Sequence, residues 1–308
     1  MKANNIENNI ENQIKAFKKF QKTHSFELTF PIMDLDEYVE IVSNLQDKTK
    51  SIKKSQEFAK FQPQDILKIP QEKHIKQSLS YQVLKGIHEI NNNSFHYIGG
   101  YVPAPYTLVS LVLELQIASE LMIFKPKFLE NLIAHSTEIL KQYAKLIYKF
   151  VDTFFILAPS ECTIMKKSYI KYVQESMNSL IKYCVSDLKI PSIMHFCSNK
   201  TGQVVNEDVI KPMKEAGISG LNIPHIIQNI GLAKKYELIL CGGINPVNIQ
   251  LQPQKATLQE LEKLLQSTNE IKYIFGTNCQ VNWAPGQIKA KELLSLYKKL
   301  IEFKKSFN

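Results

Sequence analysis

Short apolar runs alternate with longer amphipathic stretches along most of this chain, and this alternation constrains the fold more than any other feature. Stretches with the 3.6-residue apolar period of a helix separate runs that have the length of buried strands. A repeated strand–helix–strand order requires a parallel sheet whose crossovers are helices. The strand-like runs are His96–Tyr101, Thr153–Ala158, Ser192–Phe196, Gly220–Ile223, Glu237–Cys241 and Lys272–Phe275. The expected helices are Thr107–Glu120, Lys127–Phe150, Ile164–Val185, Glu207–Ala216, His225–Lys235, Leu258–Gln266 and Pro285–Phe303.

The N-terminal part is less regular. Residues 1–24 are rich in lysine and asparagine and have the weak apolar period of a surface helix, and a β-like run, Phe26–Phe30, precedes a helical pattern after Asp34. One or two further strands could lie between Ser25 and Ser94. The first choice of fold is therefore an α/β protein, a (β/α)8 TIM-type barrel with an N-terminal helical extension, and the second is an open doubly wound sheet. Residues 1–78 would hold the extension and the first barrel elements, and residues 79–308 the main part of the barrel.

Charge and composition narrow the function classes. The formal net charge is +9, and all 38 residues counted as lysine plus arginine are lysine. The lysines are scattered among glutamates rather than gathered with aromatic residues along one stripe, so we expect no nucleic-acid partner. No glycine-rich phosphate-binding motif follows a strand. Five cysteines without a leading apolar signal segment, and apolar runs too short to cross a membrane, predict reduced thiols in a soluble cytoplasmic protein.

The sharpest chemical feature is a His-x-Cys pair at the end of one strand and a cysteine at the end of another. In an extended chain the side chains at positions i and i+2 point to the same side, so His195 and Cys197 could hold one ion together. Cys279 follows the last strand-like run and would lie on the same face of a barrel. One imidazole and two thiolates suit zinc and leave a coordination position for a substrate. In a lone His-x-Cys pair, either residue is more often a packing residue than a metal ligand. The presence of Cys279 at a second strand end is what favours a metal site.

These residues resemble the HxC…C zinc motif of the methylcobamide:coenzyme M methyltransferases, a branch of the uroporphyrinogen decarboxylase superfamily. Four further stretches are similar to family motifs in order and spacing, so the resemblance covers about residues 95–300. They are Ala104–Leu108 (G-P-[FY]-T-L), Phe150–Ile156 (G-A-D-x-I-x-I), Cys241–Val247 (G-N-[VI]-[DN]-P) and Gly276–Cys279 followed by Ala284-Pro285 (G-C, then [TA]-P).

The resemblance implies a fold, a reaction and a set of site residues. The fold is a (β/α)8 barrel, and the reaction moves a methyl group from methylcobalamin or another corrinoid, carried by a partner protein, to a small thiol such as coenzyme M. Zinc would be bound by His195, Cys197 and Cys279. Many relatives have an acidic residue where this chain has Leu221–His225, so His225 is a candidate fourth ligand or a helix-capping residue. Tyr106 and Asn245 are candidate substrate-binding residues, or residues that pack a helix and shape a turn.

Three alternatives to this reaction are two other enzyme activities and a non-catalytic binding role. Uroporphyrinogen decarboxylation is disfavoured, because its substrate bears eight carboxylates and this chain has no arginine, the residue that usually binds carboxylates. A cobalamin-independent methionine synthase would use a similar zinc site to activate homocysteine. A degenerate relative would bind zinc or a corrinoid protein without turnover, and the departures from the family pattern at Ala158, Ser198 and Pro224 favour that reading. The positive net charge would suit an acidic partner protein.

Overall fold

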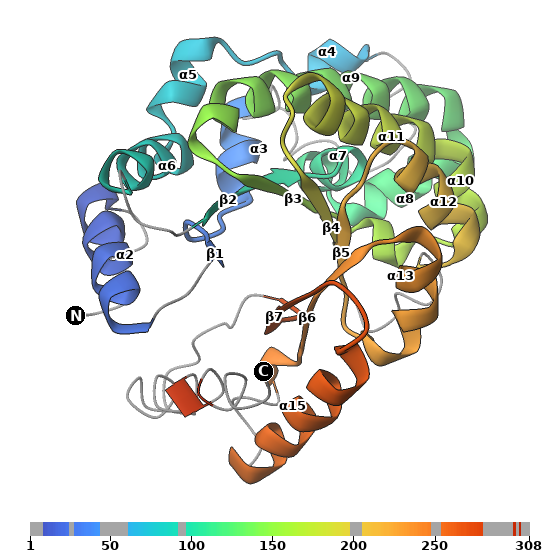
Figure 1. Cartoon of the computed structure of the whole chain (residues 1–308). Helices are drawn as coiled ribbons and strands as arrows, with labels where there is room; N and C mark the ends of the chain where they lie inside the picture. Colours follow the sequence, from blue (N-terminus) through green and yellow to red (C-terminus); the bar gives the residue numbers. More distant parts are fainter. Residues whose placement is uncertain are drawn as a thin grey trace.

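Seven parallel strands form one curled sheet in the computed structural model, which describes residues 9–24, 28–43, 61–91, 97–197, 205–247, 254–279, 298–299 and 302. The strands are β1 (Leu28–Thr29), β2 (Tyr97–Pro103), β3 (Thr153–Leu157), β4 (Ser192–His195), β5 (Gly220–Asn222), β6 (Ile239–Ile244) and β7 (Tyr273–Thr277). Their spatial order is their sequence order, and every neighbouring pair is parallel. The helices lie outside the arc of strands (Figure 1).

The described helices connect successive strands, as a sheet of parallel neighbours requires, except for α2, which precedes β1. They are α2 (Ile10–His24), α3 (Asp36–Val42), α4 (Pro63–Ile66), α5 (Glu72–Gln77), α6 (Leu79–Ile90), α7 (Pro105–Leu113), α8 (Leu115–Phe124), α9 (Pro126–Ile147), α10 (Lys166–Tyr172), α11 (Gln174–Lys182), α12 (Glu207–Glu215), α13 (Ile230–Tyr236) and α15 (Gln254–Thr268). The residue before the helix caps the N-termini of α6 and α12: Ser78 accepts from the backbone N–H of Tyr81, and Asn206 accepts from that of Asp208.

The sequence prediction of a parallel α/β sheet with an N-terminal helix is confirmed. All six expected strands are present, and β1 lies within the β-like run Phe26–Phe30. The eight-stranded, closed form of the barrel is not shown: within the described ranges β1 and β7 are the two edges of the sheet. The division at residue 78 stays a prediction. The expected helix Pro285–Phe303 falls almost wholly outside the described residues.

Some of the expected helices are wrong in their extent. The stretch Thr107–Glu120 was expected to be continuous, but it is divided into α7 and α8, whose axes differ by 109°. Glu114 between them has φ 69°, a conformation that no helix residue adopts and that side chains disfavour. Among the described helices none is by itself long and apolar enough to span a membrane, although this bent pair passes that test of length and composition when it is taken together.

Both faces of the sheet are covered, as β3 illustrates. All five of its residues are buried, and alternate side chains join different clusters. Phe154 and Ile156 pack into the large core between the sheet and the helices, whereas Phe155 and Leu157 belong to a smaller cluster with Ile193 and Cys241. The smaller cluster fills the inside of the curl.

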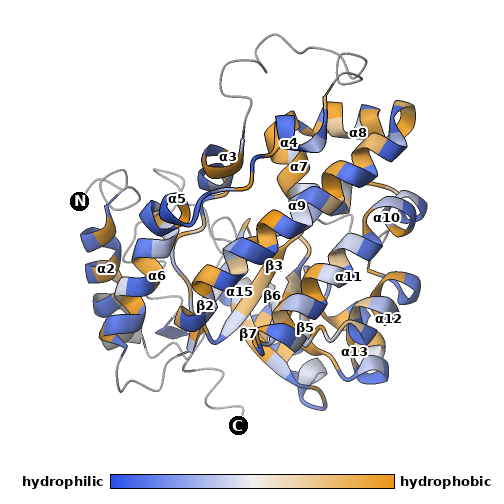
Figure 2. Ribbon diagram, turned by 90° about the horizontal axis from the view of Figure 1, so that it is seen from above, coloured by the Kyte–Doolittle hydropathy of each residue, from blue (hydrophilic) through white to orange (hydrophobic). Residues whose placement is uncertain are grey.

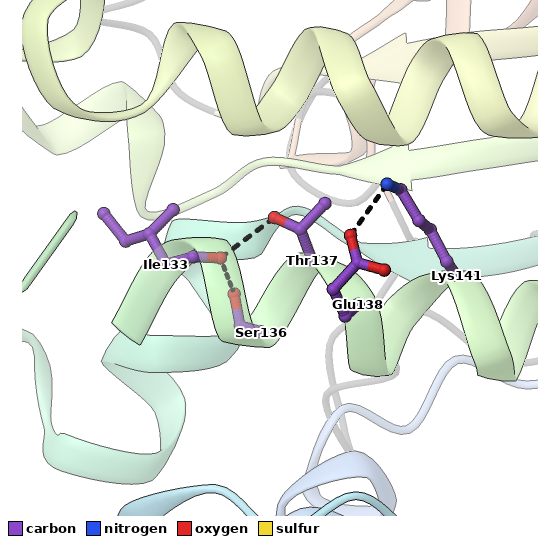
Figure 3. A network of polar contacts seen from close by, with 5 residues as sticks. All are labelled: Ile133, Ser136, Thr137, Glu138 and Lys141. Carbon is purple, nitrogen blue, oxygen red and sulfur yellow. Dashed lines mark hydrogen bonds and ion pairs between the residues drawn. The ribbon is translucent and has the colours of Figure 1, made fainter. Parts of the chain in front are cut away.

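Helix α9 is the longest helix, and it contacts β2, α7, α8 and α11. Figure 2 shows hydrophilic and hydrophobic residues alternating along it. Two of its buried hydroxyl groups have partners within the helix: Ser136 and Thr137 both donate to the carbonyl oxygen of Ile133, at 2.7 and 2.9 Å (Figure 3). Glu138 and Lys141 form a 2.8 Å ion pair on the same helix. The helix therefore packs against the sheet without leaving these hydroxyl groups unpaired.

Candidate metal centre

Three potential metal ligands converge at the carboxyl ends of β4 and β7. His195 is the last residue of β4, Cys197 follows two residues later, and Cys279 lies two residues after the end of β7. One donor atom from each residue lies within 4.8 Å of the other two, and the two Sγ atoms are 2.9 Å apart. Neither cysteine is in a disulfide. The three residues that the sequence predicted as ligands are thus brought together by the fold.

The curl of the sheet makes this meeting possible. β5 and β6 lie between β4 and β7, and neighbouring strands are about 4.8 Å apart, so in a flat sheet the ends of β4 and β7 would be separated by roughly 14 Å. The contact between Cys197 and Cys279 therefore requires the strands to bend around a common interior. This interior face carries Tyr101 of β2, whose ring stacks on Phe30 at 5.0 Å between centroids.

The electrostatics of the two thiols favour a cation. The hydrogen bond to Cys279, followed by burial, raises the pKa of Cys197 well above its usual range. Two adjacent thiols resist becoming two adjacent thiolates unless positive charge is placed between them. His195 is 6% exposed, while Cys197 is exposed, so the group lies at the surface end of a buried strand. A borderline-soft divalent ion such as zinc fits this donor set.

Two asparagines connect the strand ends that carry the ligands. Asn222, the last residue of β5, hydrogen-bonds Nδ1 of His195 and the carbonyl oxygens of Cys241 and Thr277. The side-chain oxygen of Asn278 accepts from the backbone N–H of Gly243, and its nitrogen donates to the carbonyl oxygen of Pro224 at 3.3 Å. Neither asparagine was predicted from the sequence as a site residue. Their one sequence signal is their place at a strand end, which a turn residue would share.

The other predicted site residues are not members of this three-residue group. His225 is half-buried and is not part of the three-residue metal group. Tyr106 is fully buried, and its hydroxyl oxygen is 3.5 Å from that of Ser119 on α8, so this ring packs in the core. The side-chain oxygen of Asn245 accepts from the backbone N–H of Val247 at 2.9 Å, which shapes the turn after β6. The roles of His225, Tyr106 and Asn245 in ligand or substrate binding stay predictions.

Two of the motif positions on β6 serve the fold. Cys241 is buried on β6, and burial raises the pKa of its thiol to about 12, as expected for a structural cysteine. Gly242 has φ 103°, and a Cβ there would lie 2.8 Å from Nδ2 of Asn222. The glycine is therefore required both by its backbone conformation and by the approach of Asn222. Ser198, Ala284 and Pro285 lie outside the described residues.

The chain belongs to the uroporphyrinogen decarboxylase (URO-D) family, whose sequence profile it matches over residues 46–299. The solved structure of a methyltransferase from Methanosarcina mazei is similar, with a TM-score of 0.72 and 17% sequence identity over 97% of this chain and 86% of that one. A putative vitamin-B12-independent methionine synthase from Listeria monocytogenes has a TM-score of 0.55 and 10% identity over 96% and 86% of the two chains. At these identities the likeness concerns the fold. A search of curated proteins finds no match.

Membership of the family and the likeness to the two solved structures agree on the fold class of this chain. The metal group of His195, Cys197 and Cys279 is compatible with zinc.

Proposed function

We propose that this protein is a zinc-dependent methyltransferase that moves a methyl group from a methylated corrinoid, carried by a partner protein, to a small thiol such as coenzyme M. The observation that carries the proposal is the convergence of His195, Cys197 and Cys279 at the carboxyl ends of β4 and β7. In a barrel-type α/β fold this is the edge where active sites are built. The URO-D family and the fold shared with a methyltransferase support this choice of reaction class.

The chemistry requires an activated thiol. A free thiol has a pKa of about 8.5 and is mostly protonated at neutral pH. Zinc bound by the three residues would supply a Lewis acid that favours the thiolate form of the substrate. His195, buried and hydrogen-bonded, forms the inner side of the site, while the exposed Cys197 and the half-buried Cys279 form its outer side.

The transfer itself balances without a further reactant. The thiol loses its proton to solvent, its sulfur forms a bond to the methyl carbon, and the cobalt–carbon bond breaks with both electrons left on the corrinoid. Because Cys197 is exposed, a corrinoid held by a partner protein could reach a substrate thiol bound beside it from the solvent side. The chain's part is to hold the acceptor in line for that approach.

The test of the site is the metal content of the purified protein and its cysteine variants. We expect about one zinc per chain in the wild type, as for a mononuclear site, and its loss in Cys197→Ala and in Cys279→Ala. Cys184→Ala is the matched control, because Cys184 is a buried cysteine on the π-helical segment Tyr183–Asp187 that follows α11. Stoichiometric zinc in either of the first two variants would contradict the site.

The test of the reaction uses methylcobalamin as donor, with coenzyme M and homocysteine as alternative acceptors. Formation of methylated coenzyme M together with demethylated corrinoid supports the proposal. Transfer to homocysteine from a donor other than a corrinoid would instead support a methionine-synthase-like enzyme. A zinc-loaded protein that methylates no thiol would be a non-catalytic relative.

A further inference from the structure

The side-chain amide of Asn222 is wholly engaged in a buried position. Asn222 is 4% exposed, and its Nδ2 donates to the carbonyl oxygen of Cys241 at 3.0 Å and to that of Thr277 at 3.4 Å. Carbonyl oxygens can only accept, so the nitrogen of the amide must face them. The amide oxygen must then face Nδ1 of His195, with which it is in hydrogen-bond contact. Neighbours on β6 and β7 thus fix the orientation of the amide.

This orientation determines where His195 carries its proton. Because Oδ1 of Asn222 can only accept, Nδ1 of a neutral His195 must be the N–H donor, and Nε2 is left with a lone pair. We infer that Asn222 is a positioning residue that holds His195 in the Nδ1–H tautomer and so presents Nε2 to the metal. The inference rests on the proposed function in so far as His195 is a zinc ligand, whereas the tautomer is a property of the metal-free protein.

Asn222 also connects two of the three ligands. The same amide that holds His195 on β4 is bonded to the carbonyl oxygen of Thr277, two residues before Cys279. A single side chain on β5 therefore sets the orientation of the imidazole and restrains the strand end that carries the second thiol. Outer hydrogen bonds of this kind orient metal ligands, and their loss typically weakens metal binding about 10- to 100-fold.

The first experiment measures the tautomer directly, by two-bond nitrogen–proton correlations in metal-free protein labelled with 15N-histidine at pH 8. The chain has 7 histidines, and the His195 signals are assigned as those that disappear in His195→Gln. We expect the Nδ1–H tautomer in the wild type and a shift toward Nε2–H in Asn222→Leu, which keeps the size of the side chain and removes the acceptor. An Nε2–H tautomer in the wild type would overturn the inference, whether or not the variant folds.

The second experiment measures zinc affinity by competition with a chromogenic chelator. Asn222→Leu should bind zinc about 10- to 100-fold more weakly than the wild type. Asn222→Asp should lie between the two, since a carboxylate still accepts from Nδ1–H but cannot donate to the carbonyl groups. The matched control is Asn229→Leu. In the wild type the Asn229 amide donates to the carbonyl oxygen of His225 at 2.7 Å, and this variant should bind zinc with the wild-type affinity. Equal affinities of Asn222→Leu and the wild type would overturn the inference. A wild type that binds no zinc would contradict the proposed function, while the tautomer would still decide the inference.

Discussion

At the scale of single residues, Glu161 shows how a buried carboxylate can be held beside a helix end. Glu161 follows β3 and is fully buried, and it accepts from the backbone N–H and the hydroxyl group of Thr107, in the first turn of α7. The N–H groups of a first helical turn have no partners within the helix, so this carboxylate caps α7 from a distant part of the chain. Burial nevertheless raises the pKa of Glu161 to about 7, and the hydrogen bonds from Thr107 only partly oppose that rise.

The raised pKa predicts a pH-dependent stability. Between the unfolded value of 4.5 and the folded value of about 7, the folded state binds more protons than the unfolded state. The free energy of unfolding must therefore fall as the pH rises through this window, by up to about 3 kcal/mol at about 1.4 kcal/mol per pKa unit. In Glu161→Gln this decrease should vanish. Urea unfolding at several pH values measures it, with Glu175→Gln on α11 as the exposed control. An unchanged pH dependence in Glu161→Gln would contradict the assignment.

The ligands and the residues around them differ in how far the sequence could predict them. His195, Cys197 and Cys279 were predicted because imidazole and thiol groups at two strand ends are chemically unusual. Asn222 was not, because an asparagine after a strand is equally typical of a turn, and its role depends on contacts with two strands that come later in the chain. Residues that act through hydrogen bonds between distant segments leave no local pattern.

Among the secondary-structure elements, strand β6 depends on Gly242, which lies in the second half of the strand. Its φ of 103° disfavours any side chain, and a Cβ would lie 2.8 Å from Nδ2 of Asn222 and 3.1 Å from the carbonyl oxygen of Thr277. We expect Gly242→Ala to lower the free energy of unfolding by about 1–3 kcal/mol and to weaken zinc binding. Gly231→Ala is the control: Gly231 lies in α13 with open space around it, so that change should stabilise by about 0.4–1 kcal/mol. If the two variants had equal free energies of unfolding, the methyl group added at position 242 would not strain the backbone, which would contradict this prediction.

The positions of the strands were readable from the sequence, but the break between α7 and α8 was not. The strands are short apolar runs bounded by polar residues, and this pattern is typical of buried strands in α/β proteins. The stretch around Glu114 has no proline or glycine, so its periodicity predicts one continuous helix. Tertiary packing overrides that local preference, since α7 and α8 each pack against α9.

At the scale of the whole molecule, the curl of the sheet couples the metal site to the stability of the fold. The ligands come from the ends of β4 and β7, which are separated by two strands, and Cys197 and Cys279 lie 82 positions apart in the sequence. In the unfolded chain these ligands are far apart, so an ion that needs all three binds the folded state in preference. The net charge of +9 is not tied to the metal site, and its suitability for an acidic partner protein stays a prediction.

This coupling predicts that zinc stabilises the protein. At a free zinc concentration 1,000 times the dissociation constant, the free energy of unfolding should exceed that of the chelator-treated protein by about 4 kcal/mol. Paired urea titrations with zinc and with excess chelator measure the difference. Cys279→Ala should lose most of it, because the remaining His195 and Cys197 are neighbours in the sequence and hold an ion almost equally well in the unfolded chain. If the wild type unfolded at the same urea concentration in both titrations, the folded state would have no preference for the ion, and a resident zinc at the ends of β4 and β7 would be excluded.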